Sequence, residues 1–162
     1  KSTATVHAHL KTLEEKGLIK RHQGANRSIR LSNDNTAVVP ILGRVTAGMP
    51  ILAVEDIQGY VPVSDSVRRG RELFALRVVG ESMINAGVND GDLVVIRKQD
   101  TANEGQIVVA LTDDGEATLK RYFLDKKHKL IRLHPENDAL QDMFYKNIQI
   151  QGIAVKVIKD LL

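Results

Sequence analysis

Cysteine is absent from this sequence, and long apolar runs are absent as well. Without cysteine the chain has no disulfide bonds and no thiolate metal sites, which is typical of a protein of the reducing cytosol. No apolar run approaches the roughly 20 residues that an α-helix needs to cross a bilayer. We therefore expect a cytoplasmic protein without a membrane partner. Its 162 residues suffice for one hydrophobic core, or for a core with a small appended module.

Positive charge is concentrated at the start of the chain. Residues 1–31 contain seven Lys and Arg side chains and two acidic ones, a net charge of +5, whereas the whole chain carries +3. A basic module joined to a mildly acidic body predicts contact with a polyanion, and nucleic acid is the leading candidate. A solvated basic face is the plainer alternative, and charge alone does not choose between them.

The first residues follow a helical pattern. Residues 2–16 have apolar side chains at i, i+4 and i+7, Ser2 or Thr3 at the N-cap and Gly17 at the position of a C-terminal cap. Two short extended runs, 18–21 and 27–32, then surround a turn-forming tetrad. A helix followed by a basic hairpin outlines the second half of a winged helix-turn-helix. We expect the first half to be missing, so that this chain alone binds DNA weakly.

From Pro40 onward the pattern is mainly β. Six short runs rich in β-branched residues are separated by turn signals such as Asn89-Asp90-Gly91 and Asp113-Asp114-Gly115. The runs are 73–80, 92–98, 106–112, 116–123, 129–134 and 148–158. Only 82–86 and 137–144 look capable of a helical turn or loop.

The predicted fold class is therefore a mainly β C-terminal domain preceded by a partial α+β winged helix-turn-helix. We place the partial DNA-binding module at 1–33, a linker at 34–39 and the β domain at 40–162, because residues 32–39 are first polar and then small.

Ser82 is the first residue with a chemical interpretation. It follows Gly80 just after an apolar strand, where a sharp turn can expose its hydroxyl beside backbone N–H groups that face a developing oxyanion. Most serines in such turns only cap or bond locally, so Ser82 alone is weak evidence. No histidine is well placed to activate it, since His7, His9 and His22 lie in the basic module and His128 and His134 flank a Lys-rich strand.

Lys120 is the alternative base. It lies within the apolar strand ATLKRYF, where burial would lower the lysine pKa and let the neutral amine accept a serine proton. Ser-Lys dyads are an established form of the activated nucleophile. Alternation on the strand does not decide the matter, because a lysine that points to solvent fits the same pattern.

A third segment, Gly43–Pro50 (GRVTAGMP), has small residues at Ala47-Gly48 that would let an extended backbone enter a tight cleft. An ordinary hairpin turn explains the same residues.

Taken together, these segments resemble the LexA family of self-cleaving SOS-response repressors, and more broadly the UmuD-like proteins. The resemblance runs from Ser2 to Leu162. It is carried by TVHAHLKTLEEKGLI with RSIRL, PILGRVTAGMPILA, LRVVGESMINAGVNDGDLVVIRK, GQIVVAL with EATLKRY, and LHPEN with IQGIAVKVI. The resemblance implies a LexA- or signal-peptidase-like β fold.

The resemblance also implies roles for individual residues. Ser82 would be the nucleophile, Lys120 the general base and Ala47–Gly48 the scissile bond, with the N–H of Ser82 and of an adjacent residue forming the oxyanion hole. The residues implied to seat the cleavage loop are Val45, Thr46, Met49, Pro50 and Leu52. The residues expected at DNA are Ser2, Thr3, Ala4, Thr5 and His7 on the helix, and Arg27 and Arg30 on the wing.

The partners implied by the family are double-stranded operator DNA, a second copy of the chain in a homodimer, and a RecA–single-stranded-DNA filament that stimulates self-cleavage. No metal or organic cofactor is implied. Alternatives are a UmuD-like polymerase accessory and a phage-type repressor, both disfavoured by the winged outline of residues 2–31. A signal peptidase would need a membrane anchor, and a non-enzymatic DNA-binding regulator would need no dyad.

Overall fold

The structure is a computed structural model that describes residues 3–16, 19–21, 29–31, 36–43 and 57–160. Its contacts divide the chain into two compact units, Lys1–Ala37 and Val38–Leu162. Among the described residues, no helix is both long and apolar enough to cross a bilayer.

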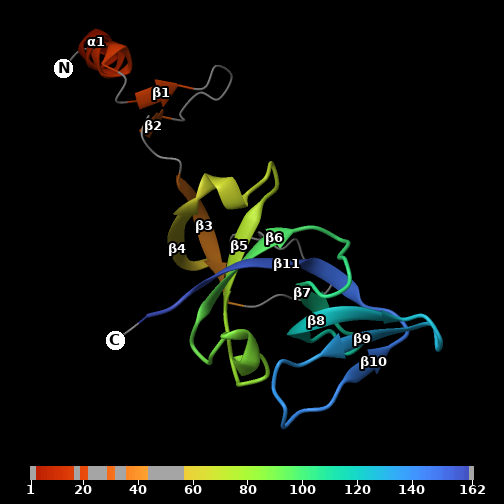
Figure 1. Ribbon diagram of the computed structural model, residues 1–162. Helices are drawn as coiled ribbons and strands as arrows, with labels where there is room; N and C mark the ends of the chain where they lie inside the picture. The colour runs from red at the N-terminus through yellow and green to blue at the C-terminus, as the bar shows by residue number, and fades with distance from the viewer. Residues whose placement is uncertain (1–2, 17–18, 22–28, 32–35, 44–56, 161–162) are drawn as a thin grey trace. The chain divides into compact units, whose positions relative to one another are not determined.

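The first unit contains helix α1 (Thr3–Glu15) and the antiparallel strands β1 (Ile19–Arg21) and β2 (Ile29–Leu31) (Figure 1). The expected helix and both expected extended runs are confirmed. The apolar stripe of α1 is not covered within the described residues, since Val6 is 59% exposed and Leu13 is 37% exposed. The helix and two-stranded pair are common to many small folds, so the winged helix-turn-helix stays a prediction.

The second unit is built on β-strands. Nine strands of the described chain form one sheet in the order β10-β9-β8-β7-β11-β6-β5-β3-β4. The pairs from β5 across to β10 are antiparallel, while β3 runs parallel to β5. The strands are β3 (Thr36–Leu42), β4 (Ile57–Ser64), β5 (Leu73–Arg77), β6 (Leu93–Lys98), β7 (Ile107–Leu111), β8 (Ala117–Asp125), β9 (Leu130–His134), β10 (Met143–Tyr145) and β11 (Gln149–Ile158). Two short 3-10 helices are η2 (Asp65–Val67) and η3 (Ile84–Ala86).

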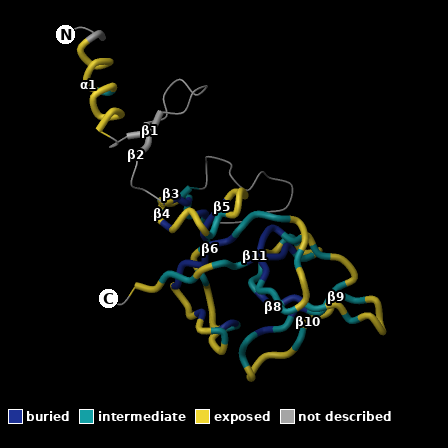
Figure 2. Tube along the Cα trace, turned by 45° about the horizontal axis from the view of Figure 1, so that its top comes forward, coloured by how far each residue is buried: buried dark blue, intermediate teal, exposed yellow. Residues whose placement is uncertain are grey.

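Buried residues gather in the central part of the sheet (Figure 2), and they form two core clusters. Along β7, Val109 and Leu111 join one buried cluster with Phe74, while Val108 and Ala110 join another with Leu133. A strand buried on both faces needs a continuous apolar run rather than an alternating one, and the sequence IVVAL has that form. All six β-rich runs expected from the sequence contain strands of this sheet.

Three strands differ from the expectation. Strand β3 begins at Thr36, so residues 36–39 of the segment that we assigned to a linker form a β-strand, in which Val39 is 1% exposed. Strand β4 was not foreseen. Strand β10 lies largely in the segment 137–144 that was expected to be a turn or loop, because its three residues pair with β9 at the edge of the sheet. Long-range pairing decides such short strands, and local pattern does not.

Gly152 is a point of close backbone packing in the sheet. It follows an irregularity in the pairing of β11 with β7, and it sits opposite Lys98 on β6. A Cβ atom built on Gly152 would come within 2.5 Å of the Arg97 carbonyl oxygen and 2.6 Å of Ile96 Cγ2. Glycine is therefore required here for close packing of backbone against backbone.

We predict that Gly152→Ala lowers the free energy of unfolding by about 1–3 kcal/mol, because the added methyl group displaces a central strand. Chemical denaturation measures the loss. Lys156→Ala, at an exposed position of the same strand, is the control and should change the free energy by less than about 0.5 kcal/mol. Equal losses in the two variants would contradict the packing argument.

Candidate active site

Ser82 lies in a tight turn that follows β5. Gly80 begins the turn at a φ of +89°, a left-handed conformation that favours glycine. Its N–H donates to Asp90 Oδ1 at 2.7 Å. The Val78 N–H donates to the Asp92 carbonyl at 2.9 Å, and the Gly91 N–H donates to the Val78 carbonyl at 2.9 Å. Residues 78–80, which lead from β5 to Ser82, are thus hydrogen-bonded to the loop 89–92.

Asp92 holds that loop in place from inside. Its side chain is almost buried, and its Oδ2 accepts from the Asn89 N–H at 2.8 Å and from Lys159 Nζ at 2.7 Å. The hydrogen bond from Lys159, and then the one from Asn89, hold the pKa of Asp92 below its ordinary value. The carboxylate is therefore charged at neutral pH and keeps both donors.

The other side of Ser82 is anchored in the core. Met83 is 1% exposed and packs in the same cluster as Phe74 and Val94. Its carbonyl accepts from the Ala86 N–H at 3.1 Å and from the Val88 N–H at 3.2 Å. Because Met83 follows Ser82 directly, its burial restricts where the serine hydroxyl can point.

Lys120 faces inward from β8. Its residue is 7% exposed, as is expected for a position two residues from Tyr122, which is 8% exposed on the same face of the strand. A lysine pointing to solvent is therefore wrong for this position. The neighbouring Arg121 lies on the opposite face, and its guanidinium pairs with Glu136.

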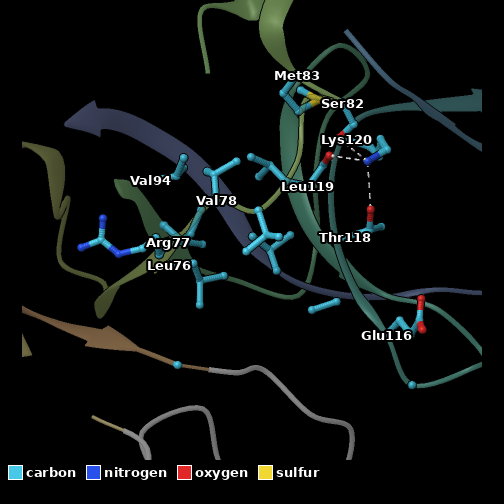
Figure 3. A pocket seen from close by; sticks show the side chains of 16 residues that line it. Leu76, Arg77, Val78, Ser82, Met83, Val94, Glu116, Thr118, Leu119 and Lys120 are labelled. Carbon is cyan, nitrogen blue, oxygen red and sulfur yellow. Dashed lines mark hydrogen bonds between the residues drawn. The ribbon is translucent and has the colours of Figure 1, made fainter. Parts of the chain in front are cut away.

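The amine of Lys120 meets three oxygen atoms (Figure 3). Nζ lies 2.8 Å from Ser82 Oγ, 3.1 Å from Thr118 Oγ1 and 3.0 Å from the Leu119 carbonyl oxygen. Burial lowers the pKa of Lys120, since removal from water disfavours the ammonium form. A neutral amine has two N–H donors and one lone pair, which matches three partners when the serine hydroxyl donates to the nitrogen.

Ser82 and Lys120 open onto a cavity of about 570 Å³. Its walls are mostly apolar and come from β5, β6, β7 and β8, with Val79 projecting at 90% exposure. Gly43, the last described residue after β3, also lines this cavity. A groove of this kind, with a paired serine and amine on one wall, can hold an extended chain against a nucleophile.

The remaining expected site residues are placed only in part. Thr5 and His7 are exposed on α1, while Thr3, Ala4 and Arg30 belong to described backbone in α1 and β2. Outside the described residues lie Ser2, Arg27, Val45, Thr46, Ala47, Gly48, Met49, Pro50 and Leu52. Their roles stay predictions.

The histidines of the second unit have other partners. His128 pairs with Asp125, and His134 pairs with Asp142, and neither histidine lines the cavity that contains Ser82. In the described part of the chain, no group of three His, Asp or Glu side chains is arranged to hold a metal ion.

Two contacts of the site were not foreseen. Thr118 lies two residues before Lys120 on the same face of β8, and its hydroxyl oxygen accepts from the amine. Asn137 donates from Nδ2 to the Glu81 carbonyl at 2.8 Å, across 56 positions of sequence. The spacing i, i+2 on a strand could have indicated Thr118, whereas no local signal indicates Asn137.

The chain is similar in sequence to several known proteins. Residues 40–155 match the Peptidase S24-like family. The chain is 46% identical over 167 residues to the LexA repressor of Bacillus mycoides, an alignment that covers 99% of this chain and 81% of the relative. It is 45% identical over 170 residues to the LexA repressor of Ligilactobacillus salivarius, covering 99% and 82%. The LexA repressor of Exiguobacterium sibiricum is 43% identical over 167 residues, covering 99% and 81%.

Burial of Lys120 predicts a pH-dependent stability. Between the lowered pKa of the folded state and the unfolded value of about 10.4, the unfolded chain binds more protons, so stability rises with pH in that interval. We expect Ser82→Ala to gain stability relative to Ser82→Ala/Lys120→Met as the pH is raised toward about 10. Chemical denaturation at several pH values measures the difference, with the serine removed so that its chemistry does not interfere.

Lys126→Met, at an exposed position, serves as the control in the same background. Its difference from the parent should stay constant with pH. If the difference in free energy of unfolding between the parent and Lys120→Met is also constant with pH, Lys120 keeps its proton in the folded state.

Proposed function

This chain belongs to the Peptidase S24-like family, and we propose that it is a repressor of the LexA type that controls DNA-damage (SOS) genes and inactivates itself by cutting its own backbone. The observation that carries the proposal is the 2.8 Å contact between the buried Lys120 amine and the Ser82 hydroxyl. Ser82 is the nucleophile and Lys120 the general base. The bond cut is Ala47–Gly48, in the segment between β3 and β4.

The reaction begins with neutral Lys120. Its two N–H groups donate to Thr118 Oγ1 and to the Leu119 carbonyl, which leaves the lone pair for the proton of Ser82. Ser82 Oγ attacks the carbonyl carbon of Ala47, and the proton passes to Nζ. Backbone N–H groups at Ser82 and an adjacent residue stabilise the oxyanion.

Collapse of the tetrahedral intermediate breaks the bond to Gly48. The Lys120 ammonium returns its proton to the departing Gly48 nitrogen, so the amine leaves uncharged and an ester joins Ala47 to Ser82. Neutral Lys120 then takes a proton from water, and the oxygen of that water attacks the ester carbonyl. When the bond to Ser82 Oγ breaks, Nζ gives this proton to Oγ, which restores the serine hydroxyl and the neutral amine. The products are an Ala47 carboxylate and a Gly48 amino group.

The substrate belongs to the same chain, which makes the first step effectively unimolecular. Control must then act on the position of the cleavage loop. Gly43 lines the cavity that contains Ser82, and Ala47 follows it by four positions in the sequence. Val45, Thr46, Met49, Pro50 and Leu52 seat the loop, and a RecA–single-stranded-DNA filament favours the seated conformation by a shift of population.

DNA binding is assigned to the first unit. The net charge of +5 over residues 1–31 supports phosphate contacts from Arg27 and Arg30. Base contacts would come from Ser2, Thr3, Ala4, Thr5 and His7, of which Thr5 and His7 are exposed on α1. Two copies of the chain would read a palindromic operator as a homodimer, with no metal or organic cofactor.

A phage-type or UmuD-like self-cleaving regulator is the alternative. The helix and paired strands of residues 3–31 favour the repressor over a UmuD-like accessory, which has no DNA-binding module.

We predict that self-cleavage of the purified chain accelerates with rising pH and levels off above the pKa of Lys120. The midpoint should lie below the ordinary lysine value of about 10.4, because burial lowers that pKa. Mass measurement of fragments that meet at Ala47–Gly48 gives the rate. A rate that is flat from about pH 7 to about pH 10 would exclude Lys120 as the base.

Three variants separate the roles. Ser82→Ala and Lys120→Met should each slow cleavage about a thousandfold or more, whereas Lys126→Met, at an exposed position, should cleave as the parent does. Fragments split at Ala47–Gly48 from Ser82→Ala would overturn the nucleophile assignment.

For the DNA-binding half, we expect Arg27→Ala and Arg30→Ala each to weaken affinity for double-stranded DNA and to reduce the dependence of log K on log salt by about one unit. Fluorescence anisotropy between about 50 and about 200 mM salt measures both. Arg68→Ala, in the second unit, is the control. Identical salt slopes for all three variants would refute phosphate contact at the wing.

A further inference from the structure

The peptide unit between Glu81 and Ser82 is hydrogen-bonded to a residue that is distant in the sequence. Asn137 Nδ2 donates to the Glu81 carbonyl oxygen at 2.8 Å. In a planar trans peptide the C=O and the following N–H point in opposite directions. A donor that fixes the Glu81 carbonyl therefore also fixes the direction of the Ser82 N–H.

Within the described part of the chain, that N–H has no acceptor. The same holds for the N–H groups of Glu81, Met83 and Ile84, whereas those of Gly80 and Asn85 are both bonded. Ser82 is half-buried and Met83 is buried, and backbone donors in such positions are normally paired. Unpaired donors next to a paired serine and amine are what oxyanion binding requires.

The segment Glu136–Asp138, here called the brace, is itself tied down. Asn137 Oδ1 accepts from the Ala139 N–H at 3.0 Å, so both ends of its amide are used. The Glu136 carbonyl accepts from the Asn85 N–H at 2.8 Å, on the far side of Ser82.

The brace also reaches the strand that carries the amine. The Glu136 carboxylate pairs with Arg121, the residue next to Lys120, and Arg121 Nη1 donates to the Gly105 carbonyl at 2.6 Å. One segment thus contacts the turn that bears Ser82 and the strand that bears Lys120. A shift of the turn relative to the strand has to break these bonds.

We propose that Asn137 is a positioning residue that aims the Ser82 N–H at the oxyanion formed during self-cleavage. The inference rests on the proposed function. Hydrogen bonding at the Glu81 carbonyl also polarises the amide, which makes the Ser82 N–H a better donor. Asn137 touches neither the reacting atoms nor Lys120, so it affects the stabilisation of the transition state and not the protonation of the base.

The test measures the pH profile of self-cleavage for the parent, Asn137→Ala and Asn137→Asp. Asn137→Asp keeps the oxygen that accepts from Ala139 and loses the donor to Glu81. We expect the plateau rate at high pH to fall about 10- to 100-fold in both variants, since a misaimed oxyanion donor raises the barrier. The pH midpoint of Asn137→Ala should match the parent, because the surroundings of Lys120 are unchanged.

Asn85→Ala is the matched control. The Asn85 side chain donates to Asp138 Oδ1 at 3.1 Å, so its removal also deletes one hydrogen bond between the turn and the brace. It leaves the Glu81–Ser82 peptide untouched, and its plateau rate should stay within about threefold of the parent. Thermal unfolding of each variant accounts for any difference in stability.

Three results overturn the inference. If the plateau rate of self-cleavage is as low in Asn85→Ala as in Asn137→Ala, the loss comes from weaker contact between the turn and the brace in general. If Asn137→Asp keeps the parent's plateau rate, the loss in Asn137→Ala comes from the missing hydrogen bond to Ala139. A shifted midpoint in Asn137→Ala would mean that Asn137 acts through Lys120. A parent chain that stays intact at every pH overturns the proposed function itself, which distinguishes that failure from the other three.

Discussion

The rest of this structure depends on one contact, the 2.8 Å approach of the buried Lys120 amine to the Ser82 hydroxyl. Burying a lysine is costly, and three oxygen partners of the amine offset part of that cost. The desolvation that destabilises the ammonium lowers the pKa of Lys120, so the amine becomes neutral, and able to accept a proton, at a lower pH than an exposed lysine does. Stability and the proposed chemistry are therefore coupled at this residue, and a more stable chain without Lys120 would lack the proposed base.

The sheet and the turn after β5 fix the distance between the Lys120 amine and the Ser82 hydroxyl. Lys120 is carried on β8, whose pairing with β7 and β9 leaves little freedom, while Ser82 sits on a turn between the buried Met83 and the bonded Gly80. The brace then joins the turn to Arg121 on β8 through Glu136. A nucleophile and base held on separate elements need such cross-links, because an error of about 1 Å is enough to slow a reaction by about a hundredfold.

The proposed catalytic pair is already assembled, which leaves regulation to the substrate. The cavity beside Ser82 is lined in part by Gly43, which precedes Ala47 of the proposed scissile bond by only four positions in the sequence. An enzyme whose substrate is tethered in this way has no need of substrate affinity, and the fraction of time that the loop is seated sets the rate. A protein that binds the seated form better than the unseated form accelerates cleavage without contributing to the chemistry. That arrangement suits a repressor, which has to persist until a signal arrives and then disappear irreversibly.

The sequence by itself determined the strands that have strong local patterns, such as β7 and β11, the helix α1, and the residue types capable of serine–lysine chemistry. Apolar runs, β-branched side chains and glycine-containing turns act over a few neighbours, so they can be interpreted locally. Only the tertiary structure decided that Lys120 points inward, that β3 and β10 join the sheet, and that Asn137 bonds the peptide before Ser82. Each of these outcomes rests on contacts between residues far apart in the chain. Their free energies come from burial and pairing in the folded state, and no short window of sequence contains both partners.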